Sequence, residues 1–241
     1  MSEKKINVKL LTYTKEPIRT ITSAIKQCYS ADTAAKIAQK VDKKKAEQLI
    51  KQIISSGHTS TIEHAYFTFA IEGISRSLTH QLVRHRIASY SQQSQRYVDL
   101  SKDDMGYIVP PEIKKNKKLL DKYEEVMRLI EKEYKELVKS GVKPEDARFI
   151  LPNACQTKIV VTMNARSLLN FFRERCCLRA QWEIRELAGK MLLEVKKVAP
   201  KIFENAGASC VSTGICWEGN MSCGLWKTIK GAELKSRLKK I

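Results

Sequence analysis

The chain has 241 residues, 43% of them hydrophobic and 29% charged, which is the balance of an ordinary soluble globular protein. That length buries a full core as one domain, or as one domain with an appendage. No apolar run is long enough to span a membrane, and the first residues lack the apolar segment of a secretory signal, so we expect a cytoplasmic protein. Seven cysteines are an odd number, which argues against a disulfide framework.

The formal net charge of +18 raises the possibility of a nucleic-acid-binding protein, because a basic surface collects phosphates. Much of the excess is lysine in residues 43–45, 114–118 and 227–240, and such runs are usually solvated faces. The sequence has no CxxC-type finger and no glycine-aromatic signature of an RNA-binding sheet. We therefore expect no specific nucleic acid partner, and keep nucleic-acid binding as the alternative function.

The amino-terminal half alternates between strand and helix patterns. Residues 6–12 and 65–74 are β-prone, and residues 17–28 predict a helix with proline in its first turn. Asp32 and Asp42 are predicted caps of two further helices, the second of which runs to about Ser56 and stops at Gly57. A helix over residues 75–83 carries its apolar residues on one face and delivers Arg84 at its end.

The carboxy-terminal half predicts longer helices. Residues 117–139 form a charged helix with an apolar stripe, residues 145–150 a short helical turn, and residues 157–162 a β-branched strand. One long helix is predicted over residues 164–198. This mixture favours an α+β fold, with a small, mainly antiparallel sheet and segregated helices. The composition changes near Asn205, so we predict a catalytic domain over residues 1–204 and an appendage rich in cysteine and lysine over residues 205–241.

The stretch from Arg84 to Tyr97 contains arginines, a histidine, hydroxyls and amides, but no acid, lysine or glycine. Guanidinium groups and amides are planar, multi-donor groups that hold phosphates and ring edges in fixed geometry. The alternative is an exposed helix end capped by serine. Three arginines and a histidine without an acid would repel one another unless an anion joined them, which favours a binding site.

Two further segments carry polar side chains. The loop over residues 57–64 lies between a predicted helix and strand and is a plausible ligand site. His58 and His64 with Glu63 have no helical metal-ligand spacing, so an ordinary loop is favoured over a metal pair. In residues 164–175, Asn164 is placed to cap a helix, and Arg166 and Asn170 share a face; an amphipathic helix with surface arginines is the alternative.

These residues carry a resemblance to a known family. Residues 84–96, Arg-His-Arg followed by Ser89, Ser94 and Arg96, resemble the RHRxxSxNxxSxR signature of flavin-dependent thymidylate synthases. Residues 57–64, 147–152 and 164–171 are similar to further segments of that family, in the same order and spacing. The resemblance covers roughly residues 5 to 200.

The resemblance implies a homotetramer, with flavin sites formed between subunits, that converts dUMP to dTMP. The carbon would come from methylenetetrahydrofolate and the hydride from NADPH through FAD. Carried over to this chain, the implied FAD contacts are Ser60, Arg84, His85, Arg86, Gln92, Asn164, Arg166 and Asn170. The implied dUMP contacts are Gln81, Arg84, Gln92, Gln93, Ser94, Gln95, Arg96, Arg148 and Arg175. Within these sets, Arg175 is the predicted catalytic residue, and His58 would line the folate and nicotinamide side.

Two positions depart from the family pattern. Ser91 stands where the signature has asparagine, so that contact would lose the bidentate reach of an amide. Arg179 stands where some members carry a histidine late in the helix. Ser94 is predicted to be a phosphate ligand and not a nucleophile, because no base-and-orienter pair is evident beside it.

The tail contains Cys210, Cys216 and Cys223 in a segment rich in glycine and serine. Three thiols are a candidate for part of a zinc or iron–sulfur site, with the fourth ligand from Cys176, Cys177 or a neighbouring subunit. The spacing is not CxxC, and reduced thiols in a packed tail are the favoured interpretation. A non-catalytic metal-binding module is the corresponding alternative function.

Overall fold

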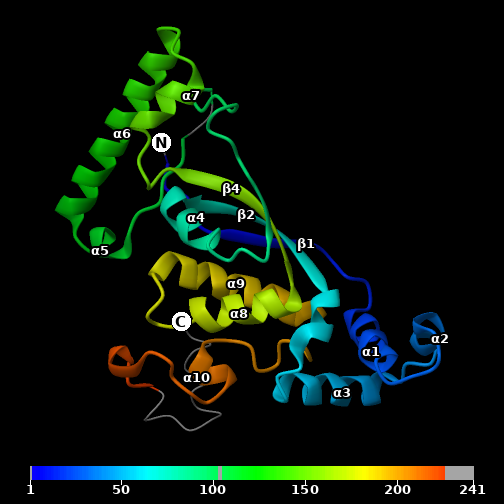
Figure 1. The fold of residues 1–241 in the computed structure, drawn as a ribbon. Helices are drawn as coiled ribbons and strands as arrows, with labels where there is room; N and C mark the ends of the chain where they lie inside the picture. Colours follow the sequence, from blue (N-terminus) through cyan, green and yellow to red (C-terminus); the bar gives the residue numbers. More distant parts are fainter. Residues whose placement is uncertain (1, 103–104, 226–241) are drawn as a thin grey trace. The chain divides into compact units, whose positions relative to one another are not determined.

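A computed structural model describes residues 2–102 and 105–225 of the chain. Its sheet has four strands in the order β1-β2-β4-β3 (Figure 1). The strands are β1 (Asn7–Tyr13), β2 (Tyr66–Ser75), β3 (Ser89–Gln92) and β4 (Gln156–Asn164). The predicted class is confirmed: the fold is α+β with a small antiparallel sheet.

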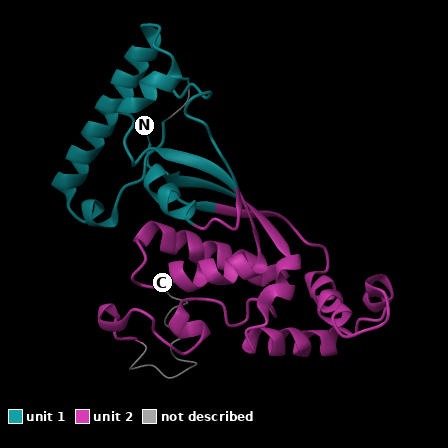
Figure 2. Ribbon diagram, viewed as in Figure 1, with its two compact units in different colours: residues 1–7, 70–84, 90–160 teal, residues 8–69, 85–89, 161–241 magenta. Residues whose placement is uncertain are grey.

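The chain divides into two compact units that interleave along the sequence (Figure 2). Unit 1 comprises residues 1–7, 70–84 and 90–160, and unit 2 comprises residues 8–69, 85–89 and 161–241. The described part of the predicted appendage, residues 205–225, falls in unit 2. The predicted boundary at residue 204 stays a prediction, and the lysine run over residues 227–240 lies outside the described residues.

Unit 1 is organised by one long amphipathic helix. Its helices are α4 (Arg76–Leu82), α5 (Pro111–Lys114), α6 (Lys117–Lys139), α7 (Pro144–Ala147) and η2 (Arg148–Ile150). Along α6, Tyr134 packs with Met105 and Ala147, and Met127 packs with Tyr107 and Val109. The apolar stripe of this helix therefore holds residues 105–109 and α7 in place.

Unit 2 contains the other helices and an aromatic core. They are α1 (Pro17–Gln27), α2 (Ala34–Gln39), α3 (Lys43–Ser55), η1 (Thr59–His64), α8 (Ala165–Arg175), α9 (Trp182–Val198), α10 (Ser209–Ser212) and η3 (Gly219–Met221). Phe203 makes edge contacts with Phe67 of β2 and Phe172 of α8, with ring centroids 5.3 and 6.0 Å apart. Phe172 contacts Phe171 in the same way at 5.7 Å. These rings are fully buried, so they fix α8 and the start of the tail against β2.

Several predicted elements are confirmed by their capping contacts. Asn164 caps α8, since its side chain accepts a hydrogen bond from the backbone N–H of Ser167 at 2.8 Å. Asp42 caps α3 in the same way through Lys45 at 2.7 Å. Helix α6 spans the predicted residues 117–139. Such caps satisfy backbone N–H groups that the helix leaves without a partner.

Three predictions of local structure were wrong. The helix predicted over residues 164–198 is two helices, because Gln181 starts α9 by accepting hydrogen bonds from the backbone N–H groups of Glu183 and Ile184. Arg179 consequently lies in the connection between the helices and not late in a helix. Thr33, and not Asp32, caps α2. Strand β3 was missed, because its four polar residues, Ser-Tyr-Ser-Gln, lack an apolar signal.

Among the described residues, no helix combines the length and apolar character that crossing a membrane requires.

Gly73 provides a test of the packing within unit 1. It lies in β2 with φ +67°, and a Cβ added there would lie 2.0 Å from the backbone oxygen of Lys5. Gly141, at φ +90°, has open space around an added Cβ. We expect Gly141→Ala to cost about 1 kcal/mol of folding free energy from left-handed strain alone. Gly73→Ala must cost clearly more, because the main chain has to move as well.

Urea unfolding followed by circular dichroism measures both variants. Equal losses of unfolding free energy in Gly73→Ala and Gly141→Ala would contradict the close approach of Lys5 to β2.

Candidate active site

The end of β3 forms a tight polar turn in unit 1. The Ser94 hydroxyl oxygen accepts hydrogen bonds from the backbone N–H groups of Arg96 at 3.1 Å and Tyr97 at 3.4 Å. The backbone N–H of Gln93 donates to the carbonyl oxygen of Lys158 in β4 at 2.9 Å, which anchors the start of the turn. The Ser94 hydroxyl oxygen thereby stabilises the turn. Its hydrogen can still be donated to an acceptor on a ligand.

Two predicted dUMP ligands, Arg96 and Arg148, both donate hydrogen bonds to Glu145. The Arg96 Nε donates to Glu145 Oε2 at 2.6 Å, and the Arg148 Nε donates to the backbone oxygen of Glu145 at 3.0 Å. The hydrogen bond and charge of Arg96 hold the pKa of Glu145 below its usual range. Residues 52 positions apart in sequence are therefore brought to the same place, as an oxyanion site requires.

Two of the three glutamines of the motif make side-chain contacts within unit 1. Gln92 Nε2 donates to the hydroxyls of Thr79 and Thr157 at 3.2 and 3.3 Å, and Gln95 Nε2 contacts Cys155 Sγ at 3.7 Å. Ser91 lies on the exposed side of β3, because successive side chains of a strand point to opposite faces. Ser91, which departs from the family pattern, therefore lies on the opposite face of β3 from Gln92.

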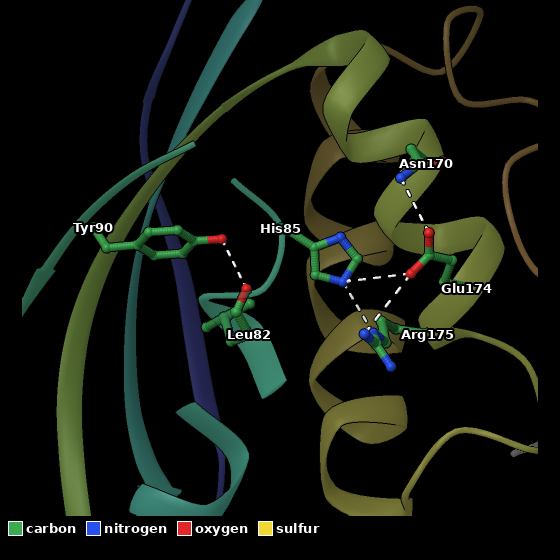
Figure 3. Close-up of polar contacts among 6 residues, drawn as sticks. All are labelled: Leu82, His85, Tyr90, Asn170, Glu174 and Arg175. Atoms are coloured by element: carbon green, nitrogen blue, oxygen red, sulfur yellow. Dashed lines mark hydrogen bonds and ion pairs between the residues drawn. The ribbon is translucent and has the colours of Figure 1, made fainter. Parts of the chain in front are cut away.

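Tyr90 ties β3 to the helix before it. Its hydroxyl donates to the backbone oxygen of Leu82 at 2.9 Å (Figure 3). Burial raises the pKa of Tyr90 to about 12, so the hydroxyl keeps its proton at neutral pH. This bond fixes the place at which α4 ends, immediately before the Arg84-His85-Arg86 sequence.

In unit 2, the end of η1 is linked to the start of α8 by a backbone hydrogen bond and an ion pair. The backbone N–H of Ala165 donates to the backbone oxygen of Ala65 at 2.8 Å. The Arg166 Nη1 then pairs with Glu63 Oε1 at 2.6 Å. Glu63 is thus an ion-pair partner of α8 in this structure. The predicted loop is therefore largely the 3-10 helix η1, which contains the exposed Ser60 and follows the exposed His58, and it is held beside Arg166.

The last turn of α8 carries a connected group of charged and polar residues. Arg175 Nε donates to His85 Nε2 at 2.9 Å (Figure 3). The Glu174 carboxylate lies 3.8 Å from both His85 Nε2 and Arg175 Nη2, and it accepts a hydrogen bond from Asn170 Nδ2 at 3.3 Å. The His85 ring also packs edge-on against Phe171 at 5.0 Å. The predicted residues His85, Asn170 and Arg175 are therefore brought together.

This geometry sets the protonation state of His85. Arginine only donates hydrogen bonds, so the acceptor Nε2 carries no proton and a neutral ring is protonated on Nδ1. Burial lowers the pKa of His85, the Glu174 carboxylate raises it, and the Arg175 guanidinium lowers it, with a net decrease. Near pH 7 the cluster therefore contains one cation, one anion and a neutral imidazole.

Other predicted residues show fewer contacts. The guanidinium groups of Arg84 and Arg86 are exposed and have no hydrogen-bond or ion-pair partner within residues 2–102 and 105–225. Gln81 contributes its backbone oxygen, which accepts from the Arg84 N–H at 3.3 Å. A cavity of about 680 Å³ in unit 2 is lined by α1, residues of α2 and His64, and it contains none of the predicted site residues.

Sequence reasoning missed Glu145 and Glu174. The motif around Arg84 is acid-free. The Glu145 carboxylate reaches Arg96 from a distant segment, and Glu174 immediately precedes Arg175 in α8. Glu174 had a detectable signal, since it follows Asn170 by four residues and so lies on the same helix face. Glu145 had none, because only the folded chain brings α7 to the end of β3.

Comparison with known proteins agrees with the fold and identifies the family. The structure is similar to that of a UMP/dUMP methylase, PolB, from Streptomyces cacaoi bound with 5-Br dUMP. The TM-score is 0.74 and the identity 22%, over 85% of this chain and 96% of that one. The family model described as thymidylate synthase complementing protein matches residues 9–201, so the chain belongs to that family.

Curated relatives support the membership over nearly the whole chain. A flavin-dependent thymidylate synthase of Clostridium tetani is 51% identical, over 95% of this chain and 96% of that protein. Those of Geobacter sulfurreducens and Pyrococcus furiosus are 49% and 46% identical, over 95% and 90% of this chain and 97% and 91% of theirs. The resemblance predicted from the Arg84–Arg96 motif is confirmed, and nucleic-acid binding as an alternative gains no support.

The His85 cluster predicts opposite effects of two substitutions. Glu174→Gln should lower the His85 pKa further, because it removes an anion that favours the charged ring. Arg175→Ala should raise the pKa, because it removes a cation and a donor to Nε2. NMR titration of histidine-labelled, ligand-free protein measures both shifts, with His85→Gln to assign the signal.

The lowered pKa of His85 also makes the stability of the fold depend on pH. The folded-state pKa lies below the reference of 6.5, so the neutral ring stabilises the fold above that value, and this contribution is lost as the pH falls through the folded-state pKa. Shifts of the same sign in the two variants would contradict the cluster.

Proposed function

We propose that the chain is a flavin-dependent thymidylate synthase, a methyltransferase that converts dUMP to dTMP. The carbon donor is methylenetetrahydrofolate, and the reducing hydride comes from NADPH. The observation that carries the proposal is the match to the family over residues 9–201, together with relatives about half identical over nearly the full length. We also propose that the enzyme is cytoplasmic and forms a homotetramer; the family resemblance supports both assignments.

The residues present suit FAD as the flavin. A dinucleotide needs cations for its diphosphate and donors for its ring edge. Arg84 and Arg86 offer exposed guanidinium groups without a partner among the described residues. The side-chain oxygen of Asn164 caps α8, so its amide nitrogen can donate to the flavin. FAD would supply the transfer of the NADPH hydride at this site. The side chains that hold it are Ser60, Arg84, His85, Arg86, Gln92, Asn164, Arg166 and Asn170.

The turn after β3 is assigned to the dUMP phosphate. Ser94 supplies a hydroxyl, and Arg96 and Arg148 supply two guanidinium forks. The carboxylate of Glu145 accepts a hydrogen bond from Arg96, and its backbone oxygen accepts one from Arg148. A doubly charged phosphate forms charge-assisted hydrogen bonds with such forks. The remaining nucleotide contacts are assigned to Gln81, Arg84, Gln92, Gln93 and Gln95. His58 is assigned to the folate and nicotinamide side.

Arg175 is assigned to the uracil ring. Its Nε is occupied by His85, and its Nη2 lies near Glu174. Its Nη1 has no hydrogen-bond or ion-pair partner in the described part of the chain, so it is the donor available to a ligand. Negative charge builds on the uracil as C6 accepts a hydride, and a fixed cation stabilises that charge as it forms. His85 and Glu174 hold the guanidinium in place before the substrate arrives.

Substitution of Arg175 tests the catalytic assignment. We expect Arg175→Ala to keep FAD but to lose about 10²- to 10³-fold in dTMP formation at saturating dUMP, as happens when a charge-stabilising donor is removed. Arg173→Ala is the matched control, because Arg173 is an exposed arginine on the same helix.

The flavin spectrum and single-turnover dTMP formation provide the measurement. Normal turnover by Arg175→Ala would contradict the catalytic assignment of Arg175. A purified wild-type protein that is colourless and cannot take up FAD would contradict the proposed function itself and return attention to nucleic-acid binding.

Ser94→Ala separates a phosphate ligand from a nucleophile. Loss of one hydrogen bond to a charged phosphate should raise the dUMP concentration at half-maximal rate about tenfold, with little change in kcat. Ser91→Ala is the control, since its side chain lies on the exposed face of β3. Steady-state kinetics over a range of dUMP concentrations decide the matter, and loss of all turnover at saturating dUMP would favour a nucleophilic role.

A further inference from the structure

The cysteines of the tail are not arranged as a metal centre. Cys210, Cys216 and Cys223 are free of disulfides, and in the part of the chain that the structure describes no three His, Cys, Asp or Glu side chains are grouped so as to hold a metal ion. Polar side chains do converge in unit 1, where Gln92 of β3 contacts hydroxyls of α4 and β4.

The Gln92 amide uses both of its N–H groups within unit 1. Its Nε2 donates to Thr79 Oγ1 at 3.2 Å and to Thr157 Oγ1 at 3.3 Å, and an amide nitrogen has only two hydrogens. The amide oxygen, Oε1, has no hydrogen-bond partner among residues 2–102 and 105–225, and it is accessible to solvent. This half-buried glutamine therefore presents an acceptor, and no donor, to a ligand.

Thr79 decides which end of the Gln92 amide faces it. The Thr79 hydroxyl donates to the backbone oxygen of Arg76 at 2.9 Å, so its one hydrogen is already used. If the amide were rotated, Gln92 Oε1 would face the Thr79 oxygen with no hydrogen between them, which is costly at a residue only 1% exposed. Thr157 has no such preference, because its hydroxyl has no second partner in the described residues and can donate as well as accept.

We propose that Gln92 Oε1 accepts a hydrogen bond from the N3–H of the uracil of dUMP, and that Thr79 is the positioning residue that keeps this acceptor in place. The edge of uracil carries one N–H donor between two carbonyl acceptors. Arginine only donates, so Arg175 can serve a ring carbonyl but not N3–H. The inference rests on the proposed function and adds to it the means by which the site distinguishes one base from another.

Gln92 lies close to the turn that is assigned to the dUMP phosphate. Ser94 follows Gln92 by two residues, a span of at most about 7 Å, and Gln93 between them is fixed to Lys158 by its backbone N–H. The deoxyribose separates the base from the phosphate by a comparable distance. The flavin ring also carries an imide N–H, but the nearness of the phosphate turn within unit 1 favours uracil as the partner of Gln92.

A fixed acceptor at this point selects against cytosine. The N3 of cytosine carries no hydrogen, so in bound dCMP two acceptors would face each other, whereas thymine keeps the N3–H of uracil. A polar group left without a partner in a desolvated site weakens binding about 10- to 100-fold. We therefore expect discrimination against dCMP but not, through this contact, against dTMP.

Thr79→Val tests the proposal, because it removes the oxygen that orients the amide while keeping the shape of the side chain. Gln92 is then held by Thr157 alone, which accepts either end of the amide, and a rotated amide donates to N3 of cytosine. Isothermal titration calorimetry of the flavin-loaded protein measures the Kd of dUMP, dCMP and dTMP. The ratio of the dCMP Kd to the dUMP Kd should fall about tenfold or more in Thr79→Val, and the ratio for dTMP should not change.

Thr157→Val is the matched control, since Thr157 is as deeply buried as Thr79 and bonds to the same amide nitrogen. It should keep the wild-type dCMP-to-dUMP ratio, because Thr79 still orients Gln92. Thr79→Ser should keep the ratio as well, since it retains the hydroxyl. Gln92→Met removes the acceptor itself and should lower the ratio, which provides a second test if Thr79→Val does not fold.

An unchanged dCMP-to-dUMP ratio in folded Thr79→Val, or in Gln92→Met, would overturn the proposal. An equal fall of the ratio in Thr157→Val would also overturn it, because it would indicate only the loss of a buried hydroxyl. Loss of FAD from Thr79→Val with an unchanged nucleotide ratio would assign the acceptor to the flavin instead. The flavin spectrum and dTMP formation are recorded on the same samples: a wild-type protein that lacks both contradicts the proposed function itself, whereas a failed ratio in an active enzyme contradicts only this inference.

Discussion

The candidate catalytic group of unit 2 depends on a run of packed aromatic rings. Phe67 on β2 contacts Phe203, which contacts Phe172, which contacts Phe171, and Phe171 finally packs against His85. The phenylalanines are fully buried, and each aromatic pair contributes about 0.5–1.5 kcal/mol beyond the area that it buries. A helix held this firmly can keep a charged side chain at its end in one position, which electrostatic stabilisation of a reacting ring requires.

Charge balance is the second constraint. The acid-free run from Arg84 to Tyr97 would be unfavourable in isolation, and the fold brings Glu145 to Arg96 and Glu174 to within 3.8 Å of His85. Outside this run, Glu63 pairs with Arg166. The exposed arginines Arg84 and Arg86 have no such acid among the described residues. The arginines without an acidic partner are the ones assigned to the diphosphate of a dinucleotide, whose own charge would supply the balance.

Much of this arrangement was predictable from local chemistry. The caps at Asp42 and Asn164, the α6 stripe and the family motif are properties of adjacent residues or of fixed periodicities, so they are visible in the sequence. Strand β3 was not, because its stability comes from pairing with β4 and not from its own polar residues. The break before Gln181 was not predicted either, because the apolar pattern of a helix continues on both sides of it.

The contacts of Glu174 show why the site needed the structure as well as the motif. Helix spacing suggests its contact with Asn170, but only the return of residues 85–89 to α8 places His85 near the same carboxylate. The pair of Arg175 and neutral His85 then persists because Glu174 compensates the guanidinium charge without taking its Nε. At 3.8 Å the carboxylate is beyond direct hydrogen-bond distance of Nη2, so a developing negative charge on a ligand can form the shorter contact. Partial compensation of this kind holds the Arg175 guanidinium in place while leaving Nη1 and Nη2 able to donate to a ligand.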